Sequence, residues 1–243
     1  MVERGDPDRF AATMAAPPAA RARLWPLYAL NLEVARAPWV SKEPMIAEMR
    51  LQWWRDVVAE PTAPAHEVAG PLQDLIREAG LPLAVLDRLI AARRWDVYKD
   101  AFADRAAFDA YLDDTGAGLM WLAALALGAG PEVEGQVREF GRATALVQFL
   151  RAVPELEARG RMPLVDGRPA AVRALAVAAL ARVQGFSVRV AGPGQAALLA
   201  GWQTRAVLRL VARDPVAVAE GRLALPEFSR RGRLVWAALT GLL

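Results

Sequence analysis

Carboxylates at helical spacing are the side chains of this sequence best placed to do chemistry. Asp96 with Asp100, and Asp109 with Asp113, are each four residues apart. On a helix this spacing places both carboxylates on one face, where they could hold Mg²⁺ together with water and phosphate oxygens. The alternative for each pair is a solvated helix face, because basic residues nearby would balance the charge. The spacing alone leaves both interpretations open.

Arginine is the second group that could bind a substrate. All but two of the 30 basic residues are arginine, and the formal net charge is +3. The planar guanidinium suits phosphate and diphosphate groups, although a genome rich in G and C would also favour arginine and alanine codons. The chain has no lysine-rich tract with interleaved aromatic residues, so we expect no nucleic acid partner.

Nucleophiles and soft metal ligands are scarce. The chain has no cysteine and a single histidine, His66, in the proline-rich stretch PTAPAHEVAG. One histidine in a loop cannot form a catalytic triad or a histidine-rich metal site. The absence of cysteine excludes a disulfide scaffold and a thiol nucleophile, and it fits a reducing compartment.

Helical periodicity dominates the sequence and predicts the elements that must position these groups. Apolar residues recur at helical spacing in segments bounded by proline and glycine, and no convincing strand pair appears. We therefore expect an all-α bundle of roughly eight to ten helices, built as one domain over residues 1–243. The 55% hydrophobic content is that of a packed globular chain.

Single residues predict several helix boundaries. We expect a break between Pro38 and Pro44, a helix end at Gly80, an N-cap at Asp104, an interruption at Gly116 and a helix end at Pro154. For the helix after Pro82, the spacing predicts an inner face of Val85, Leu86, Leu89 and Ile90. For the helix after Pro44, the spacing predicts a core-facing stripe of Met45, Ile46, Met49, Trp53 and Val57.

The first residues and the longest apolar run indicate where in the cell the protein is located. The first ten residues, MVERGDPDRF, contain acids and no apolar segment, so we expect no secretory signal. The run from Gly118 to Gly128 is shorter than the ~20 residues of a membrane-spanning helix. We expect a cytoplasmic protein, or one that is peripheral on the inner membrane.

Four segments, taken in order, resemble the squalene/phytoene synthase family. They are DPDRFAATMAAPPAARARLWPLYALN, LQWWRD, YLDDTGAGLMWL and FGRATALVQFLRAVPELEARGRMPL. Each is weak alone, but their order and separation make the resemblance specific. It implies an isoprenoid-synthase fold, a helical bundle around a central cavity. In that family, two aspartate motifs on facing helices hold Mg²⁺, which ionises a prenyl diphosphate.

The resemblance breaks down where the metal chemistry would occur. Matching the two motifs places Ala35 and Trp39 at the aspartate positions of the first, and Ala152 and Leu156 at those of the second. We therefore expect no catalytic residues and no metal ligands, with Mg²⁺ only under an enzymatic alternative. The residues that match the family elsewhere, or carry charge near the motifs, are weak candidates for ligand binding: Tyr28, Arg36, Trp54, Arg55, Gly118, Gln148, Arg151 and Arg161.

A second resemblance concerns the segment LNLEVARAPWVSKEPMIAEMRLQWWRD. It is similar to a branch of the family that lacks the aspartates and includes an assembly factor for respiratory complex I. This implies a non-catalytic assembly factor or a prenyl-lipid-binding adaptor, with complex I subunits or an isoprenoid lipid as partners. The alternative is a Mg²⁺-dependent prenyltransferase that condenses prenyl diphosphates head to head. A third interpretation is a peripheral membrane protein without a pocket.

The C-terminal stretch SRRGRLVWAALTGLL joins three arginines to an apolar tail. It predicts a terminal helix docked on the bundle, or a contact with an anionic membrane surface.

Overall fold

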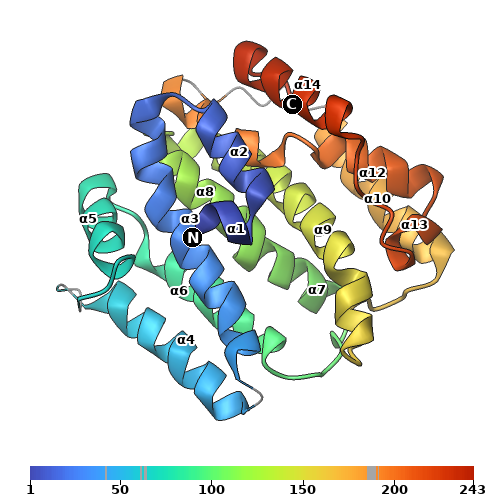
Figure 1. Ribbon diagram of the computed structural model, residues 1–243, viewed down its shortest axis with the longest axis horizontal. Helices are drawn as coiled ribbons and strands as arrows, with labels where there is room; N and C mark the ends of the chain where they lie inside the picture. The colour runs from blue at the N-terminus through green and yellow to red at the C-terminus, as the bar shows by residue number, and fades with distance from the viewer. Residues whose placement is uncertain (42, 61, 63–64, 185–189, 191) are drawn as a thin grey trace.

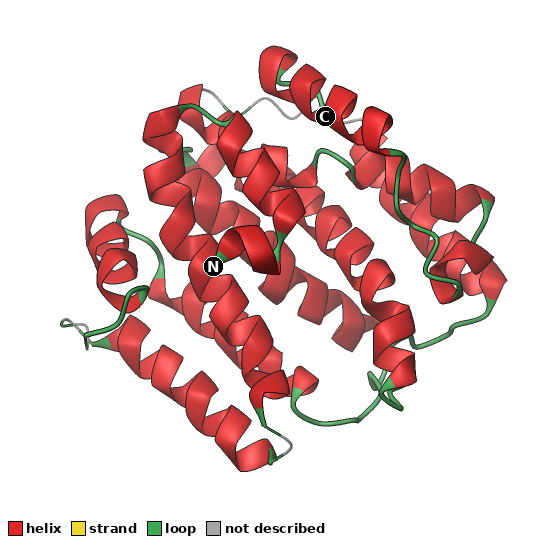
Figure 2. Ribbon diagram, viewed as in Figure 1, coloured by secondary structure: helices red, strands yellow, loops and turns green. Residues whose placement is uncertain are grey.

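A computed structural model describes residues 1–41, 43–60, 62, 65–184, 190 and 192–243 (Figure 1). Every regular element in these ranges is a helix, and Figure 2 shows the helices joined by loops. The expected all-α fold class is confirmed. Within the same ranges, no helix is both long and apolar enough to cross a membrane.

The helices vary from single turns to long rods. In chain order they are α1 (Val2–Gly5), α2 (Pro7–Ala15), α3 (Pro18–Val40), α4 (Pro44–Ala59), α5 (Ala69–Ala79), α6 (Leu83–Ala92), α7 (Arg105–Leu112), α8 (Gly118–Ala126), α9 (Glu134–Ala158), α10 (Pro169–Gln184), α11 (Gln195–Leu198), α12 (Thr204–Arg213), α13 (Val216–Ala219) and α14 (Glu227–Thr240). Short 3₁₀ turns cover Arg93–Asp96, Pro131–Val133, Gly192–Gly194 and Leu199–Gly201, and a π-helical turn covers Asp113–Ala117.

Three helices, α3, α8 and α9, form the middle of the bundle. The helix α3 packs against α4, α5 and α8, while α9 packs against α8, α10 and α12. Figure 1 shows α4 along one edge of the molecule and α14 along the opposite edge, with the short α1 and α2 lying across the middle. The two longest helices, α3 and α9, can therefore contribute side chains to the same interior space.

Two expected helix boundaries are wrong because proline does not end these helices. Pro38 lies inside α3, which continues to Val40, and Pro154 lies inside α9, which continues to Ala158. A proline removes one backbone hydrogen bond to the residue four positions before it. Both prolines lie in the last turns, and Pro38 is buried, so packing holds the helical path. Of the expected break only Ser41 and Glu43 are described as non-helical, and Lys42 lies outside the described residues.

The predicted core-facing stripe of α4 is also wrong, except at Val57. Met45 and Met49 are 73% and 66% exposed, whereas Leu51 and Trp54 are buried. Apolar residues occur on nearly every side of this helix, so periodicity could not choose among its faces. The choice comes from tertiary packing, because α4 lies against α3 and α6 on one side only.

Other local predictions are confirmed. The side chain of Asp104 accepts a hydrogen bond of 2.7 Å from the backbone N–H of Ala107, which makes it the N-cap of α7. Gly80 ends α5 in the left-handed conformation with φ of 59°. The predicted inner face of α6 is buried, with Leu86, Leu89 and Ile90 fully covered.

The expected interruption at Gly116 is a widened helical turn. The chain stays helical from α7 through the π-helical turn into α8, and such turns often occur at functional sites. A Cβ atom at Gly116 would lie 2.2 Å from the Cβ of Ala145, and one at Gly141 would lie 2.8 Å from the Cα of Ala117. Glycine therefore permits the π-helical turn and α9 to meet backbone against backbone.

Candidate functional site

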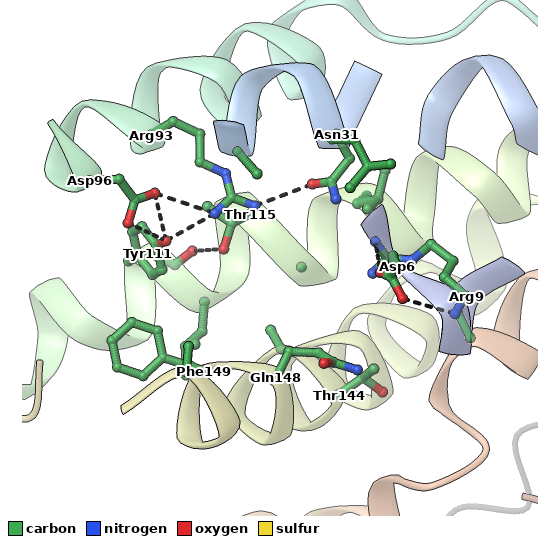
Figure 3. Close-up of a pocket in the computed structure, with 18 of the residues that line it drawn as sticks. Asp6, Arg9, Asn31, Arg93, Asp96, Tyr111, Thr115, Thr144, Gln148 and Phe149 are labelled. Atoms are coloured by element: carbon green, nitrogen blue, oxygen red, sulfur yellow. Dashed lines mark hydrogen bonds and ion pairs between the residues drawn. The ribbon is translucent and has the colours of Figure 1, made fainter. Parts of the chain in front are cut away.

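A cavity of about 450 Å³ lies between α3, the π-helical turn and α9. The N-terminal helices contribute Gly5 and Arg9 to its lining, and the 3₁₀ turn after α6 contributes Arg93 and Asp96. In Figure 3, Asn31, Arg93 and Asp96 lie across the open space from Thr144, Gln148 and Phe149. The lining thus combines a charged part with the apolar side chains Leu32, Leu119, Met120, Phe149 and Leu156.

The four positions that the family resemblance assigned to aspartates all line this cavity. Ala35 and Trp39 come from α3, and Ala152 and Leu156 come from α9. The spacing of four residues places each pair on one face of its helix. The helix faces that would hold a metal are thus directed into the cavity, and their side chains at these four positions are apolar.

The charged part of the lining is a closed hydrogen-bonded network centred on Arg93. Its guanidinium donates to the Tyr111 hydroxyl at 3.0 Å, to Asn31 Oδ1 at 3.2 Å and to Asp96 Oδ2 at 3.4 Å. The Tyr111 hydroxyl lies 3.0 Å from Asp96 Oδ2 (Figure 3). One arginine, one aspartate and two neutral polar groups thus pair with one another without a ligand, while the buried Arg93 Nε has no hydrogen-bond partner among the described residues.

Burial governs the titration of this network. Burial raises the pKa of the Asp96 carboxyl, while the nearby Arg93 charge and the Tyr111 hydrogen bond oppose that shift. Burial also raises the pKa of the Tyr111 phenol, and the Asp96 carboxylate adds to it. Burial lowers the pKa of the Arg93 guanidinium, but Tyr111 and Asp96 outweigh that effect and raise it above its ordinary value. The Asp96 carboxylate is thus already engaged by Arg93 and Tyr111 and is not free to bind a metal.

A second cluster joins the N-terminal helices to α3. Asp6 caps α2 by accepting a 2.9 Å hydrogen bond from the Arg9 N–H, and it forms a 3.0 Å ion pair with the Arg9 guanidinium. That guanidinium lies 5.1 Å from the centre of the Tyr28 ring. Burial raises the pKa of the Tyr28 phenol to about 12, with Arg9 lowering it and Asp6 raising it.

We expect Tyr28 to titrate well above an ordinary phenol. Its neutral form is favoured by folding, so its contribution of about 2–3 kcal/mol is present below pH ~10 and is lost as the pH rises through about 12. Absorbance at 295 nm across an alkaline titration measures this, and Tyr28→Phe should remove the component near pH 12. A Tyr28 component that titrates near pH 10 in the folded protein would contradict the buried environment.

A second cavity of about 510 Å³ adjoins the first, with Gly5, Asp6 and Gln148 lining both. Asp8 is the polar centre of its lining. The carboxylate accepts hydrogen bonds from Gln203 at 2.6 Å, from Arg151 at 3.1 Å and from Arg230 at 2.6 Å. These residues connect α2, α9, the segment before α12, and α14, so one carboxylate ties the two ends of the chain together.

The predicted ligand-binding residues are divided among different environments. Tyr28 and Gln148 line the central cavity, and Gln148 and Arg151 line the second. Arg161 is buried between the rings of Trp39 and Trp95 and donates to the backbone carbonyls of Trp95 and Asp96.

The other four predicted residues, like Arg161, lie outside both linings. Arg36 is exposed and its guanidinium lies next to Gly5. Trp54 is buried against the rings of Trp53 and His66. Arg55 pairs with Asp87 at 2.6 Å, and Gly118 is buried with a Cβ position 3.3 Å from Val85.

Neither acid pair singled out from spacing forms a metal site. The chain leaves the helical path after Asp96, so Asp96 is buried while Asp100 is exposed in a loop. Asp109 pairs with Arg105 at 2.8 Å, and Asp113 pairs with two arginines of α9. Asp109 and Asp113 therefore fit the alternative interpretation, in which nearby basic residues balance the charge of each carboxylate.

Sequence reasoning missed most of the polar lining. Asp6 had a detectable signal, because an aspartate followed by proline is typical of a helix N-cap with proline in the first turn. No local sequence signal predicts the hydrogen-bonded network of Arg93, Asp96, Tyr111 and Asn31, because its members come from three separate elements of the chain.

Comparison with known proteins identifies the fold family. The squalene/phytoene synthase family model matches residues 2–166. The chain belongs to the squalene/phytoene synthase family. The matched part contains α1 to α9 and therefore both faces of the central cavity.

One curated relative of this squalene/phytoene synthase family member is NADH dehydrogenase (ubiquinone) complex I, assembly factor 6, from Bos taurus. It is 24% identical over 166 residues, which make up 67% of this chain and 50% of the relative. The matched region thus spans half the length of that protein.

Solved structures share the fold. A dehydrosqualene synthase in complex with ligand matches with a TM-score of 0.81 and 14% identity, covering 98% of this chain and 93% of the other. A squalene synthase from Alicyclobacillus acidocaldarius matches with a TM-score of 0.60 and 17% identity, covering 99% and 91%. The expected isoprenoid-synthase fold is confirmed.

Proposed function

We propose that this chain is a non-catalytic member of the squalene/phytoene synthase family that supports the assembly of respiratory complex I. Its central cavity would bind a prenyl lipid instead of ionising a prenyl diphosphate. The observation that carries the proposal is the apolar character of Ala35, Trp39, Ala152 and Leu156 in the cavity lining. These residues occupy the faces on which the family resemblance expects metal-binding aspartates.

The remaining acids of the lining do not fit a magnesium–diphosphate site. Such a site needs several carboxylate oxygens that converge on one ion. Asp6 is paired with Arg9, Asp96 with Arg93, and Glu155 with Arg159 at 2.5 Å. Among the described residues, no group of three or more histidines, cysteines or acids is close enough to hold a metal. No catalytic step through Mg²⁺ is therefore derived for this cavity.

The link to complex I rests on the matching relative, which is named as a complex I assembly factor. The matched 166 residues are comparable in extent to the family match over residues 2–166, which contains the cavity. We propose that the chain acts from the cytoplasm or from the periphery of the inner membrane, with complex I subunits or assembly intermediates as partners.

A genetic experiment tests this role. Deleting the gene should lower NADH–quinone activity in isolated membranes, and the wild-type chain supplied in trans should restore it. A succinate–quinone assay on the same membranes controls for general loss of respiratory function. Unchanged NADH–quinone activity after deletion would overturn the link to complex I.

The cavity itself predicts a lipid ligand. Its lining places Leu119, Met120, Phe149 and Leu156 around a space large enough for an extended apolar chain. We expect Ala152→Trp to fill this space and to reduce co-purifying prenyl lipid about tenfold, as measured by extraction and mass spectrometry. Ala178→Trp, on the exposed side of α10, is the matched control. Equal lipid content in wild type and Ala152→Trp would contradict lipid binding in this cavity.

A further inference from the structure

The C-terminal helix α14 turns an apolar face toward solvent. Phe228 is 92% exposed, Leu239 is 81% exposed and Trp236 is 60% exposed, and Val235 is exposed as well. Phe228, Val235 and Leu239 are separated by seven and four residues, which places them on one side of a helix. The opposite side carries Ala237, the buried residue by which α14 contacts the bundle.

The charges of α14 are unbalanced, with Arg231 at the border of the apolar face and Arg230 and Arg233 on either side of Ala237. The helix carries three arginines, at positions 230, 231 and 233, and one acid, Glu227. Glu227 accepts hydrogen bonds of 2.8 Å from both Arg230 and Arg231. Among the described residues, no carboxylate forms an ion pair with Arg233, whose Nε donates to the Ser229 hydroxyl at 3.2 Å. Arg230 also forms a 2.6 Å ion pair with Asp8, so the three arginines of α14 face two carboxylates and Arg233 is the surplus positive charge.

The exposed apolar face of α4 provides a contrast within the same molecule. It also presents large apolar side chains, including Met45 and Met49. The arginines around it are each paired with one acid: Arg50 with Glu33, Arg55 with Asp87 and Arg94 with Glu48. Of the two exposed apolar faces, the one on α14 has surplus positive charge.

We propose that α14 docks the protein on an anionic phospholipid surface. An amphipathic helix of this kind lies in the membrane interface with its apolar side chains inserted, while arginines at its border contact lipid phosphates. Trp236 has the amphipathic ring that favours this depth.

Vesicle flotation of the full chain tests the docking surface. We expect binding to vesicles of phosphatidylcholine with phosphatidylglycerol to exceed binding to phosphatidylcholine alone by about tenfold, and to weaken as salt is raised. Phe228→Ser with Leu239→Ser should reduce binding about tenfold or more. Arg231→Gln with Arg233→Gln should reduce binding to the anionic vesicles while leaving the weaker binding to phosphatidylcholine nearly unchanged.

The matched control is Met45→Ser with Met49→Ser on α4, which removes two exposed apolar side chains from the opposite edge of the molecule. All variants should keep the wild-type melting temperature within a few degrees, because the replaced side chains are exposed. Absence of vesicle binding by the wild type, or equal loss in the α4 control, would overturn the proposal. So would a wild-type dimer that the α14 serine variant dissociates, since a second copy would then cover this face.

Discussion

Replacing Asp96 by asparagine is expected to lower the free energy of unfolding by about 3–5 kcal/mol. The substitution keeps the shape of the side chain but removes the charge that compensates Arg93 in a buried site. An arginine left without its counter-charge in the interior is strongly destabilising. Urea denaturation followed by circular dichroism at pH 7 measures the change.

Two further variants isolate this cause. Asp109→Asn removes a carboxylate from the exposed Arg105–Asp109 pair and should change stability by less than about 1 kcal/mol. The double variant Arg93→Met, Asp96→Asn should recover part of the loss, because the uncompensated charge is removed as well. A loss below about 1 kcal/mol in Asp96→Asn would show that the network does not hold a buried charge.

Gly116→Ala is expected to destabilise the fold by about 1–3 kcal/mol, since the added methyl group meets a packed neighbour. Its Cβ would lie 2.2 Å from the Cβ of Ala145 and 3.2 Å from the Cα of that residue. The π-helical turn and α9 would have to separate, and this would also distort the cavity that both elements line. Thermal unfolding measures the effect.

The matched control for Gly116 is Gly70→Ala in α5. Apart from its chain neighbours and its own helix backbone, no atom of the described residues lies within 4 Å of the Cβ position at Gly70, so the added methyl group is tolerated and should increase helix stability by a few tenths of a kcal/mol. The double variant Gly116→Ala, Ala145→Gly should regain part of the lost stability. Equal stability of Gly116→Ala and wild type would contradict the close contact between the π-helical turn and α9.

Helix ends and buried helix faces were predicted best where they depend on interactions within a few residues of the chain. The Asp104 N-cap, the Gly80 terminus and the buried face of α6 each depend on side chains within a few residues of one another. The predictions failed where tertiary packing determines the end of a helix or which of its faces is buried. Pro38 and Pro154 are accommodated inside helices, and the apolar residues of α4 are sorted by the neighbours on one side of that helix.

In the candidate site, too, the residues identified by sequence motifs were predicted, and the long-range contacts were not. Its four apolar positions were found from motif spacing and the family resemblance, and all four line the cavity. The Arg93 network and the Asp8 ion pairs were not found, because they join residues separated by as many as 222 positions. A single sequence holds no local signal for contacts of that kind.

We propose that this cavity does not ionise prenyl diphosphates. The most direct measurement incubates the purified chain with farnesyl or geranylgeranyl diphosphate and Mg²⁺ and follows the release of diphosphate. We expect no release above a control without protein, because Ala35, Trp39, Ala152 and Leu156 offer no ligand to the ion. Protein-dependent release that Ala152→Trp abolishes would contradict the claim and would identify the chain as a prenyltransferase.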